Sequence, residues 1–172
     1  GANDGSAEKG LSYDAGEVGR AFLLDGMDDE VLIPASPSLN VRSLTVEGWI
    51  NPSDVSQQRP VVEWCATNDY AGVHLWISVV PQGGGSLPGT LWANVRDTAN
   101  GTHLLTSAPG LIASNQWSHV ALTYDEASGN AQLYLNGASV ASADIGTFVP
   151  KTGVPLHLGR RPTTCYETWP SM

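Results

Sequence analysis

The regular alternation of aliphatic residues with other residues is the feature that most constrains how this chain can fold. Between residues 73 and 79, Val, Leu, Ile and Val fill the odd positions, whereas His74, Trp76 and Ser78 fill the even ones. Residues 91–96, Leu-Trp-Ala-Asn-Val-Arg, repeat the pattern. Successive side chains of a β-strand point to opposite faces, so both segments are predicted to be strands that bury one face.

Turn-forming residues divide the rest of the chain into similar short segments. The 172 residues include 19 Gly and 11 Pro, and loops such as 34–40, 81–89 and 125–130 separate the apolar runs. Further strands are predicted over residues 21–24, 30–33, 44–50, 61–65, 103–107, 118–124, 131–135 and 156–159, and no convincing helical stretch occurs. We therefore predict one all-β domain over residues 1–172, an antiparallel two-sheet β-sandwich.

The charge balance excludes several kinds of partner. Asp and Glu number 17 against 8 Lys and Arg, which gives a formal net charge of −9. Nucleic acids and anionic membranes require a basic surface, so neither is an expected partner. Membrane insertion is not expected either, because no apolar run reaches the roughly 18 residues of a spanning helix. The chain begins with Gly, so we expect that a targeting segment was removed or that this is a piece of a larger protein.

The two cysteines, Cys65 and Cys165, stand apart from any Cys or His cluster of the kind that holds zinc. They are expected to form either one disulfide or two buried thiols, and the sequence does not decide between these alternatives.

Three stretches together resemble the concanavalin A-like family of laminin-G-type jelly rolls, in its bacterial and extracellular branch. They are FLLDGMDDEVLIP (22–34) with SPSLN (36–40), LTVEGWINP (44–52), and the segment from QWSHVA to LYLNG (116–137). The resemblance implies a jelly-roll sandwich in a secreted or cell-surface protein of several domains. Residues 1–10 and 161–172 depart from the family's terminal strands. Either those strands have been trimmed, or the tail around Cys165 replaces one.

The segment Asp25-Gly-Met-Asp28-Asp29 places three carboxylates within one turn. Carboxylate oxygens are preferred ligands of Ca²⁺, and the resemblance implies a Ca²⁺ near this loop with Asp28 or Asp29 as the main side-chain ligand. The alternative is a solvated acidic turn whose aspartates cap backbone amides.

The even positions of the two alternating strands suggest a ligand surface. If the connecting loop is centred near Gly85, Trp76 pairs with Asn94, Ser78 with Trp92 and His74 with Arg96. His74, Trp76, Trp92, Asn94 and Arg96 would then share one outward face, which Trp64 and Tyr70 could extend. Indole planes beside hydrogen-bonding side chains suit a sugar ring. The alternative is that the tail 166–169 or a loop covers these rings, which would make the cluster structural.

Catalytic patterns are missing from the sequence. Glu47 and Glu63 lack a carboxylate two residues on, whereas hydrolases of the resembled fold place acids close together on one strand. Trp49 and Trp117 are predicted to be core residues. The function that we expect is non-catalytic recognition of a glycan or glycosylated surface, with Ca²⁺ shaping a loop. The alternatives are a structural or adhesion module that binds protein and, third, a glycoside hydrolase.

Overall fold

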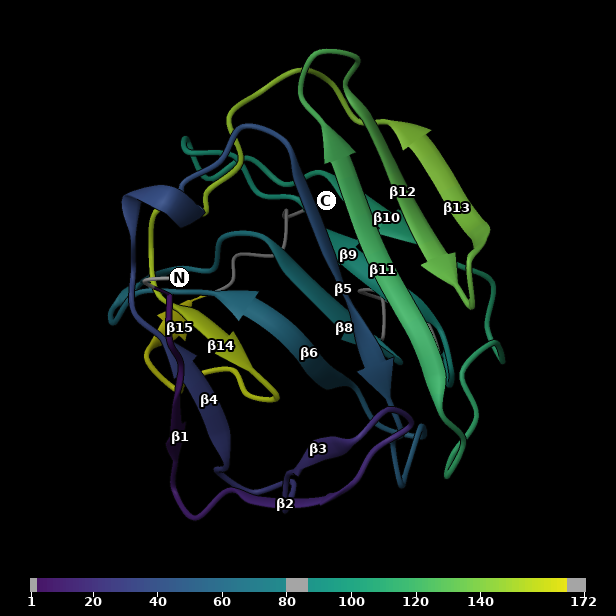
Figure 1. The fold of residues 1–172 in the computed structure, drawn as a ribbon. Helices are drawn as coiled ribbons and strands as arrows, with labels where there is room; N and C mark the ends of the chain where they lie inside the picture. Colours follow the sequence, from purple (N-terminus) through teal and green to yellow (C-terminus); the bar gives the residue numbers. More distant parts are fainter. Residues whose placement is uncertain (1–2, 80–86, 167–172) are drawn as a thin grey trace.

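Two antiparallel sheets face each other in the computed structural model, which describes residues 3–79 and 87–166 (Figure 1). The seven-stranded sheet has the order β1 (Ser6–Glu8), β4 (Glu30–Ile33), β14 (Leu156–Leu158), β6 (Arg59–Trp64), β8 (His74–Ile77), β9 (Leu91–Asn94) and β10 (Leu104–Thr106). The four-stranded sheet has the order β13 (Ala138–Asp144), β12 (Asn130–Leu135), β11 (Ser118–Asp125) and β5 (Leu44–Ile50). The predicted all-β sandwich is confirmed.

Two short pairs of strands complete the fold. The hairpin of β2 (Ser12–Ala15) and β3 (Arg20–Leu23) is antiparallel, whereas β7 (Asp69–Tyr70) and β15 (Cys165–Tyr166) pair in parallel. The helical content of the described residues is one 3-10 turn, Pro37–Leu39. Nothing in the described part of the chain is a helix with the length and apolarity that crossing a membrane requires.

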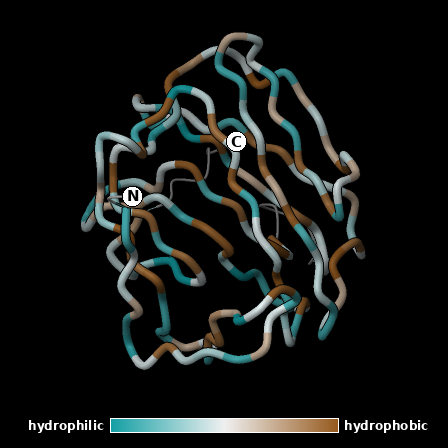
Figure 2. Tube along the Cα trace, viewed as in Figure 1, coloured by the Kyte–Doolittle hydropathy of each residue, from teal (hydrophilic) through white to brown (hydrophobic). Residues whose placement is uncertain are grey.

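The hydrophobic core lies between the two main sheets, where the alternation predicted it. Leu75, Ile77 and Leu91 of the seven-stranded sheet belong to the same buried cluster as Val120 and Leu122 of the four-stranded sheet, and each is at most 2% exposed. Burial of one such side chain stabilises the fold by about 1.5–3 kcal/mol. Figure 2 shows hydrophilic and hydrophobic residues alternating along these strands.

Strand positions agree with the sequence where the alternation is strong. The bounds of β4 and β5 are as predicted, and the other predicted strands differ by one or a few residues at their ends. The strands β1, β2, β7, β13 and β15 were not predicted. Within the terminal regions expected to be atypical, β1 pairs with β4 and β15 pairs with β7. Of the predicted loop 81–89, residues 81–86 lie outside the described residues.

The predicted register between β8 and β9 is wrong by two residues. His74 pairs with Asn94 and Trp76 pairs with Trp92, instead of Trp76 with Asn94. A shift by an even number keeps every side chain on its predicted face, because side chains alternate with a period of two. The face assignments therefore hold although the partners differ.

Candidate functional site

The outer face of the seven-stranded sheet brings together most of the predicted ligand residues. One row of paired residues runs across β14, β6, β8 and β9 and contains His157, Glu63, His74 and Asn94. Trp76 and Trp92 form the neighbouring pair, and the rings of His74 and Trp92 lie 5.1 Å apart. We call this surface the covered face.

The prediction that the indoles of this face are open to solvent is wrong. Trp76 and Trp92 are only 6% and 5% exposed, and His74, Asn94 and Arg96 are fully buried or nearly so. The rings are therefore covered, as in the alternative; of the tail 166–169 named there as a possible cover, residues 167–169 lie outside the described residues. Ligand binding through these residues stays a prediction that requires the cover to move.

Arg161 provides part of the cover. Its Nε donates to both carboxylate oxygens of Glu63, at 2.7 and 2.9 Å, and its guanidinium lies 4.3 Å from the centre of the Trp76 ring. The indole Nε1 of Trp76 donates to Glu63 Oε2 at 2.9 Å. The fully buried Glu63 is thus held by an arginine and an indole, which compensates for its removal from water.

A second buried carboxylate is held in the same manner. Arg160 Nη1 donates to Glu30 Oε1 at 2.9 Å, and the Nδ1 of His157 lies 2.6 Å from Glu30 Oε2. The other ring nitrogen of His157 lies 3.2 Å from the carbonyl oxygen of Cys65. Two consecutive arginines therefore fix the segment before β15 to two glutamates of the seven-stranded sheet.

A disulfide between Cys65 and Cys165 closes the same region, with the two Cα atoms 6.0 Å apart. This settles the alternative that the sequence left open. Cys165 begins β15, whose parallel pairing with β7 places Tyr166 beside Tyr70, with the two rings 6.3 Å apart. The covalent bond, the arginines and this strand pair all hold the C-terminal segment to the domain.

The two remaining predicted residues lie in different environments. Trp64 is not part of the covered face. It lies two residues after Val62 on β6, points to the same inner face of the sheet and belongs to the core between the sheets. Tyr70 does meet the covered face, since the guanidinium of Arg96 lies 5.5 Å from the centre of its ring. The prediction of a common surface is therefore wrong for Trp64.

The three predicted metal ligands are close together in the structure. Asp25, Asp28 and Asp29 each offer a carboxylate oxygen, and these atoms lie within 4.8 Å of one another. Asp29 Oδ2 accepts from the backbone N of Asp25, and Asp25 Oδ1 accepts from the backbone N of Met27. Gly26 has a φ of +77°, which lets the chain turn tightly between the aspartates. The capping bonds of the alternative and the convergence of the oxygens are both present.

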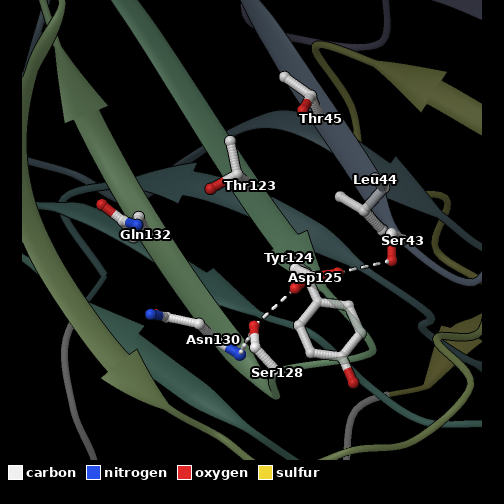
Figure 3. Close-up of a pocket in the computed structure, with 9 residues that line it drawn as sticks. All are labelled: Ser43, Leu44, Thr45, Thr123, Tyr124, Asp125, Ser128, Asn130 and Gln132. Carbon is white, nitrogen blue, oxygen red and sulfur yellow. Dashed lines mark hydrogen bonds between the residues drawn. The ribbon is translucent and has the colours of Figure 1, made fainter.

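The outer face of the four-stranded sheet is open and was not predicted as a site. A groove of about 450 Å³ lies on it, close to the turn between β11 and β12 (Figure 3). Its lining is mostly small and polar and comprises Ser43, Leu44, Thr45, Thr123, Tyr124, Asp125, Ser128, Asn130 and Gln132. We call it the outer groove.

Trp49 lies on the same outer face, and its prediction as a core residue is wrong. The side chain is 45% exposed, and its ring packs edge-on against His119, its partner on β11, at 5.2 Å. Trp117, also predicted to be in the core, is only half-buried. The sequence could have predicted the exposure of Trp49. Leu44 and Ile50 point into the core from even positions of β5, so Trp49, at an odd position, points to the outer face.

Two stacked antiparallel sheets, with aromatic and polar side chains on their outer faces, define a jelly-roll β-sandwich of the concanavalin A-like class. A family model described as the concanavalin A-like lectin/glucanases superfamily matches residues 25–170, and the chain belongs to this family. A comparison with curated proteins finds no match.

Solved structures with the same fold include several that hold or engage glycans. Domain 4 of AbnA, an extracellular arabinanase of family GH43 from Geobacillus stearothermophilus, was solved in complex with arabinotriose; it is 21% identical, with 93% of this chain and 69% of that chain covered and a TM-score of 0.54. The CBM40 of the Ruminococcus gnavus IT-sialidase, bound to α2,3 sialyllactose, is 16% identical, with 74% and 68% covered and a TM-score of 0.57. A structure of botulinum neurotoxin type C, whose cell entry depends on interaction with two ganglioside molecules, is 13% identical. The match covers 95% of this chain and 40% of that chain, with a TM-score of 0.59.

Proposed function

We propose that this domain is a non-catalytic glycan-recognition module of an extracellular protein. Support for this function comes from solved structures of the same fold that hold saccharides: arabinotriose in domain 4 of AbnA and α2,3 sialyllactose in the CBM40 of the Ruminococcus gnavus IT-sialidase. The disulfide between Cys65 and Cys165 supports an extracellular location, because disulfides persist in oxidising compartments.

The observation that carries the proposal is the exposed indole of Trp49 on the same sheet face as the outer groove. Covering an exposed aromatic ring with a ligand removes apolar surface from water, which lowers the free energy. The flat indole also suits the C–H face of a sugar ring. The groove adds neutral hydrogen-bonding groups, such as those of Thr123 and Gln132, within the size range of small-molecule sites.

A glycan array of neutral and anionic saccharides tests the function directly. We expect at least one class of saccharide to be retained by the domain and released by the free saccharide. Protein unfolded by heat serves as the control for non-specific retention. Retention of no saccharide under any condition would contradict the proposal.

Hydrolysis is less well supported than binding. A general acid must reach the glycosidic oxygen of its substrate. Glu30 and Glu63 are buried and already hydrogen-bonded to Arg160 and Arg161. Neither carboxyl is therefore placed to act on a polysaccharide while the cover is closed.

A bound Ca²⁺ at Asp25, Asp28 and Asp29 forms part of the proposal. Ca²⁺ takes six to eight oxygen ligands, and three convergent carboxylates supply the hard, charged part of such a set. Asp29 is buried while Asp25 and Asp28 are exposed, so an ion here would tie the exposed turn to the body of the domain.

Thermal unfolding with and without the ion tests this site. Millimolar Ca²⁺ is expected to raise the unfolding temperature by a few degrees, reversibly with EDTA, because a ligand of the native state stabilises by mass action. Asp28→Asn should abolish the shift, whereas Glu17→Gln, which removes one exposed charge from the β2–β3 connection, should keep it. An equal shift in both variants would refute the assignment.

An adhesion module that binds protein is the second candidate, and the β2–β3 hairpin favours it. Tyr13, Val18, Phe22 and Leu23 are all substantially exposed, and such patches mark interaction surfaces. This alternative predicts that Val18→Asp combined with Phe22→Asp abolishes adhesion to a film of deglycosylated matrix protein and leaves saccharide binding intact. Unchanged adhesion in that double variant would reject it.

A further inference from the structure

The outer groove presents its amide groups in one defined orientation. Gln132 Oε1 accepts from the Tyr134 hydroxyl at 3.0 Å and from Ser139 Oγ at 3.4 Å. Asn130 Oδ1 accepts from Ser142 Oγ at 3.3 Å. Because the carbonyl oxygens are occupied, the amide nitrogens Nε2 of Gln132 and Nδ2 of Asn130 remain to donate to a ligand.

Three of the groove residues lie in one row across neighbouring strands. Thr123 of β11 pairs with Thr45 of β5 on one side and with Gln132 of β12 on the other (Figure 3). Neighbouring strands are about 4.8 Å apart, so the row offers hydroxyl, hydroxyl and amide at regular spacing. Within the described residues, neither threonine hydroxyl makes a side-chain hydrogen bond, so both can donate to and accept from a ligand hydroxyl.

The charge of this face disfavours anionic ligands. None of β5, β11, β12 and β13 contains a lysine or an arginine, and Arg42, next to the groove residue Ser43, is ion-paired with Glu126. Asp125 lies at the end of the groove, and a hydrogen bond from the Ser128 hydroxyl holds the pKa of its carboxyl below the ordinary value. Asp125 is therefore an ionised acceptor for sugar hydroxyls, and it repels carboxylate, sulfate and phosphate groups on a ligand.

The distance between the groove and Trp49 sets the size of the ligand. Thr45, Glu47 and Trp49 point to the same face of β5, so Trp49 lies about 13 Å along the strand from Thr45. In the row between them, Ala121 of β11 pairs with Glu47 and with Tyr134, and Ala121 is itself buried. A single monosaccharide does not reach both ends of this surface, whereas an extended oligosaccharide does.

From these observations we infer that the outer face of the four-stranded sheet binds a neutral, extended oligosaccharide. One sugar ring stacks on Trp49, and another places its hydroxyls on Thr45, Thr123, Gln132 and Asp125. This inference rests on the proposed function and adds to it the surface, the charge class and the length of the ligand.

Calorimetric titration of the whole domain with defined saccharides tests the inference. The neutral probes are the linear hexasaccharides of xylose, arabinose, glucose (β1,4 and α1,4) and mannose, and the anionic probes are 3′-sialyllactose and hexagalacturonate. We expect at least one neutral hexasaccharide to bind, its monosaccharide to bind too weakly to measure, and both anionic probes to fail. Trp49→Ala and Gln132→Ala should each weaken binding by roughly tenfold or more, the loss expected for one stacked ring or one oriented hydrogen bond.

Phe22→Ala is the matched control, because Phe22 is an aromatic residue of similar exposure on the β2–β3 hairpin, outside the four-stranded sheet. Binding of a neutral hexasaccharide that neither Trp49→Ala nor Gln132→Ala weakens would overturn the groove and leave the proposed function standing. Stronger binding of an anionic probe, lost in Trp49→Ala, would overturn the neutral class. Failure of every probe would overturn the groove, and a negative glycan array beside it would show that the proposed function fails as well. Unchanged unfolding temperatures of the variants confirm that each comparison concerns binding.

Discussion

The outer faces of the two sheets follow the same alternation of side chains and yet differ in almost every physical respect. On the seven-stranded sheet, the side chains are large and ionic, and a distant segment with Arg160, Arg161 and Cys165 closes over them. On the four-stranded sheet, they are mostly small, polar and open, with the acidic Glu47 and Asp125 among them and Trp49 exposed at one end. A strand pattern therefore fixes which residues leave the core, whereas contacts distant in sequence decide which of them reach solvent.

Removal of the disulfide that holds the cover should destabilise the domain strongly. Cys65→Ser with Cys165→Ser opens a loop with a sequence separation of 100 residues. The chain-entropy model gives a loss of about 4.7 kcal/mol for a loop of that length. Urea unfolding measures this loss, with the reduced wild-type protein as the control. Equal unfolding midpoints for the oxidised wild-type protein and the variant would contradict a stabilising role of the disulfide. If the variant also gained saccharide binding that depends on Trp76, the covered face would regain its predicted role.

The two indoles provide the next test, because each represents one outer face. Trp76→Ala is expected to cost about 3–5 kcal/mol, since it empties a buried site and leaves Glu63 without one of its donors. Trp49→Ala is expected to cost less than about 1 kcal/mol, because the ring is half exposed. Denaturant unfolding of both variants measures the difference. Equal losses would show that the faces are not energetically distinct.

A matched pair of glutamates sharpens the contrast further. Arg161 and Trp76 both donate hydrogen bonds to the carboxylate of Glu63. Glu63→Gln replaces one accepting oxygen with an amide NH2 group, which cannot accept, so the variant should be destabilised by about 2–3 kcal/mol. Glu47→Gln on the open face should stay within about 0.5 kcal/mol of the wild type. Thermal unfolding of the two variants provides the measurement. A loss for Glu47→Gln as large as that for Glu63→Gln would contradict the model of one covered and one open face.

Changes of pH should affect the stability of the domain less than any of these substitutions. Hydrogen bonding to Lys151 lowers the pKa of Asp69 beside the cover, and hydrogen bonding to Ser128 lowers the pKa of Asp125 in the groove. A lowered native pKa adds stability above the unfolded value of about 3.9, and this stability is lost as the pH falls through the native pKa. Lys151→Met and Ser128→Ala should each raise the pKa of their own aspartate only. Carboxyl carbon NMR titrations check this, and unchanged titration curves would refute both assignments.

Local pattern was sufficient to predict most of the sandwich. In β5, apolar residues such as Val46 recur with a clear period of two. In β4, residues 31–33 form a short apolar run, and turn residues bound both strands. The strand β13 was missed because its Ala and Ser residues alternate in size too weakly to mark a buried face. The register of β8 against β9 depends on the connection between them, whose geometry the sequence does not specify.

The candidate sites were less predictable, because their character depends on contacts between distant segments. Trp76 is buried in part by Arg161, which lies far along the chain and belongs to no recognisable strand motif. The exposure of Trp49, in contrast, follows from its phase in β5, and this local signal was outweighed by the expectation that a tryptophan in a strand is a core residue. The convergence of Asp25, Asp28 and Asp29 was predictable because the three lie in one turn.

The sheet that holds the outer groove also imposes a shape on whatever lies along it. Strands of a sheet rotate by about 20–25° from one to the next, with a fixed hand. The row through Thr123 and the pair formed by Trp49 and His119 therefore lie on a saddle. A flexible polymer can coil to follow such a curve, whereas a stiff ribbon cannot. Curvature would thus favour single, soluble strands over the flat surface of a crystalline fibre.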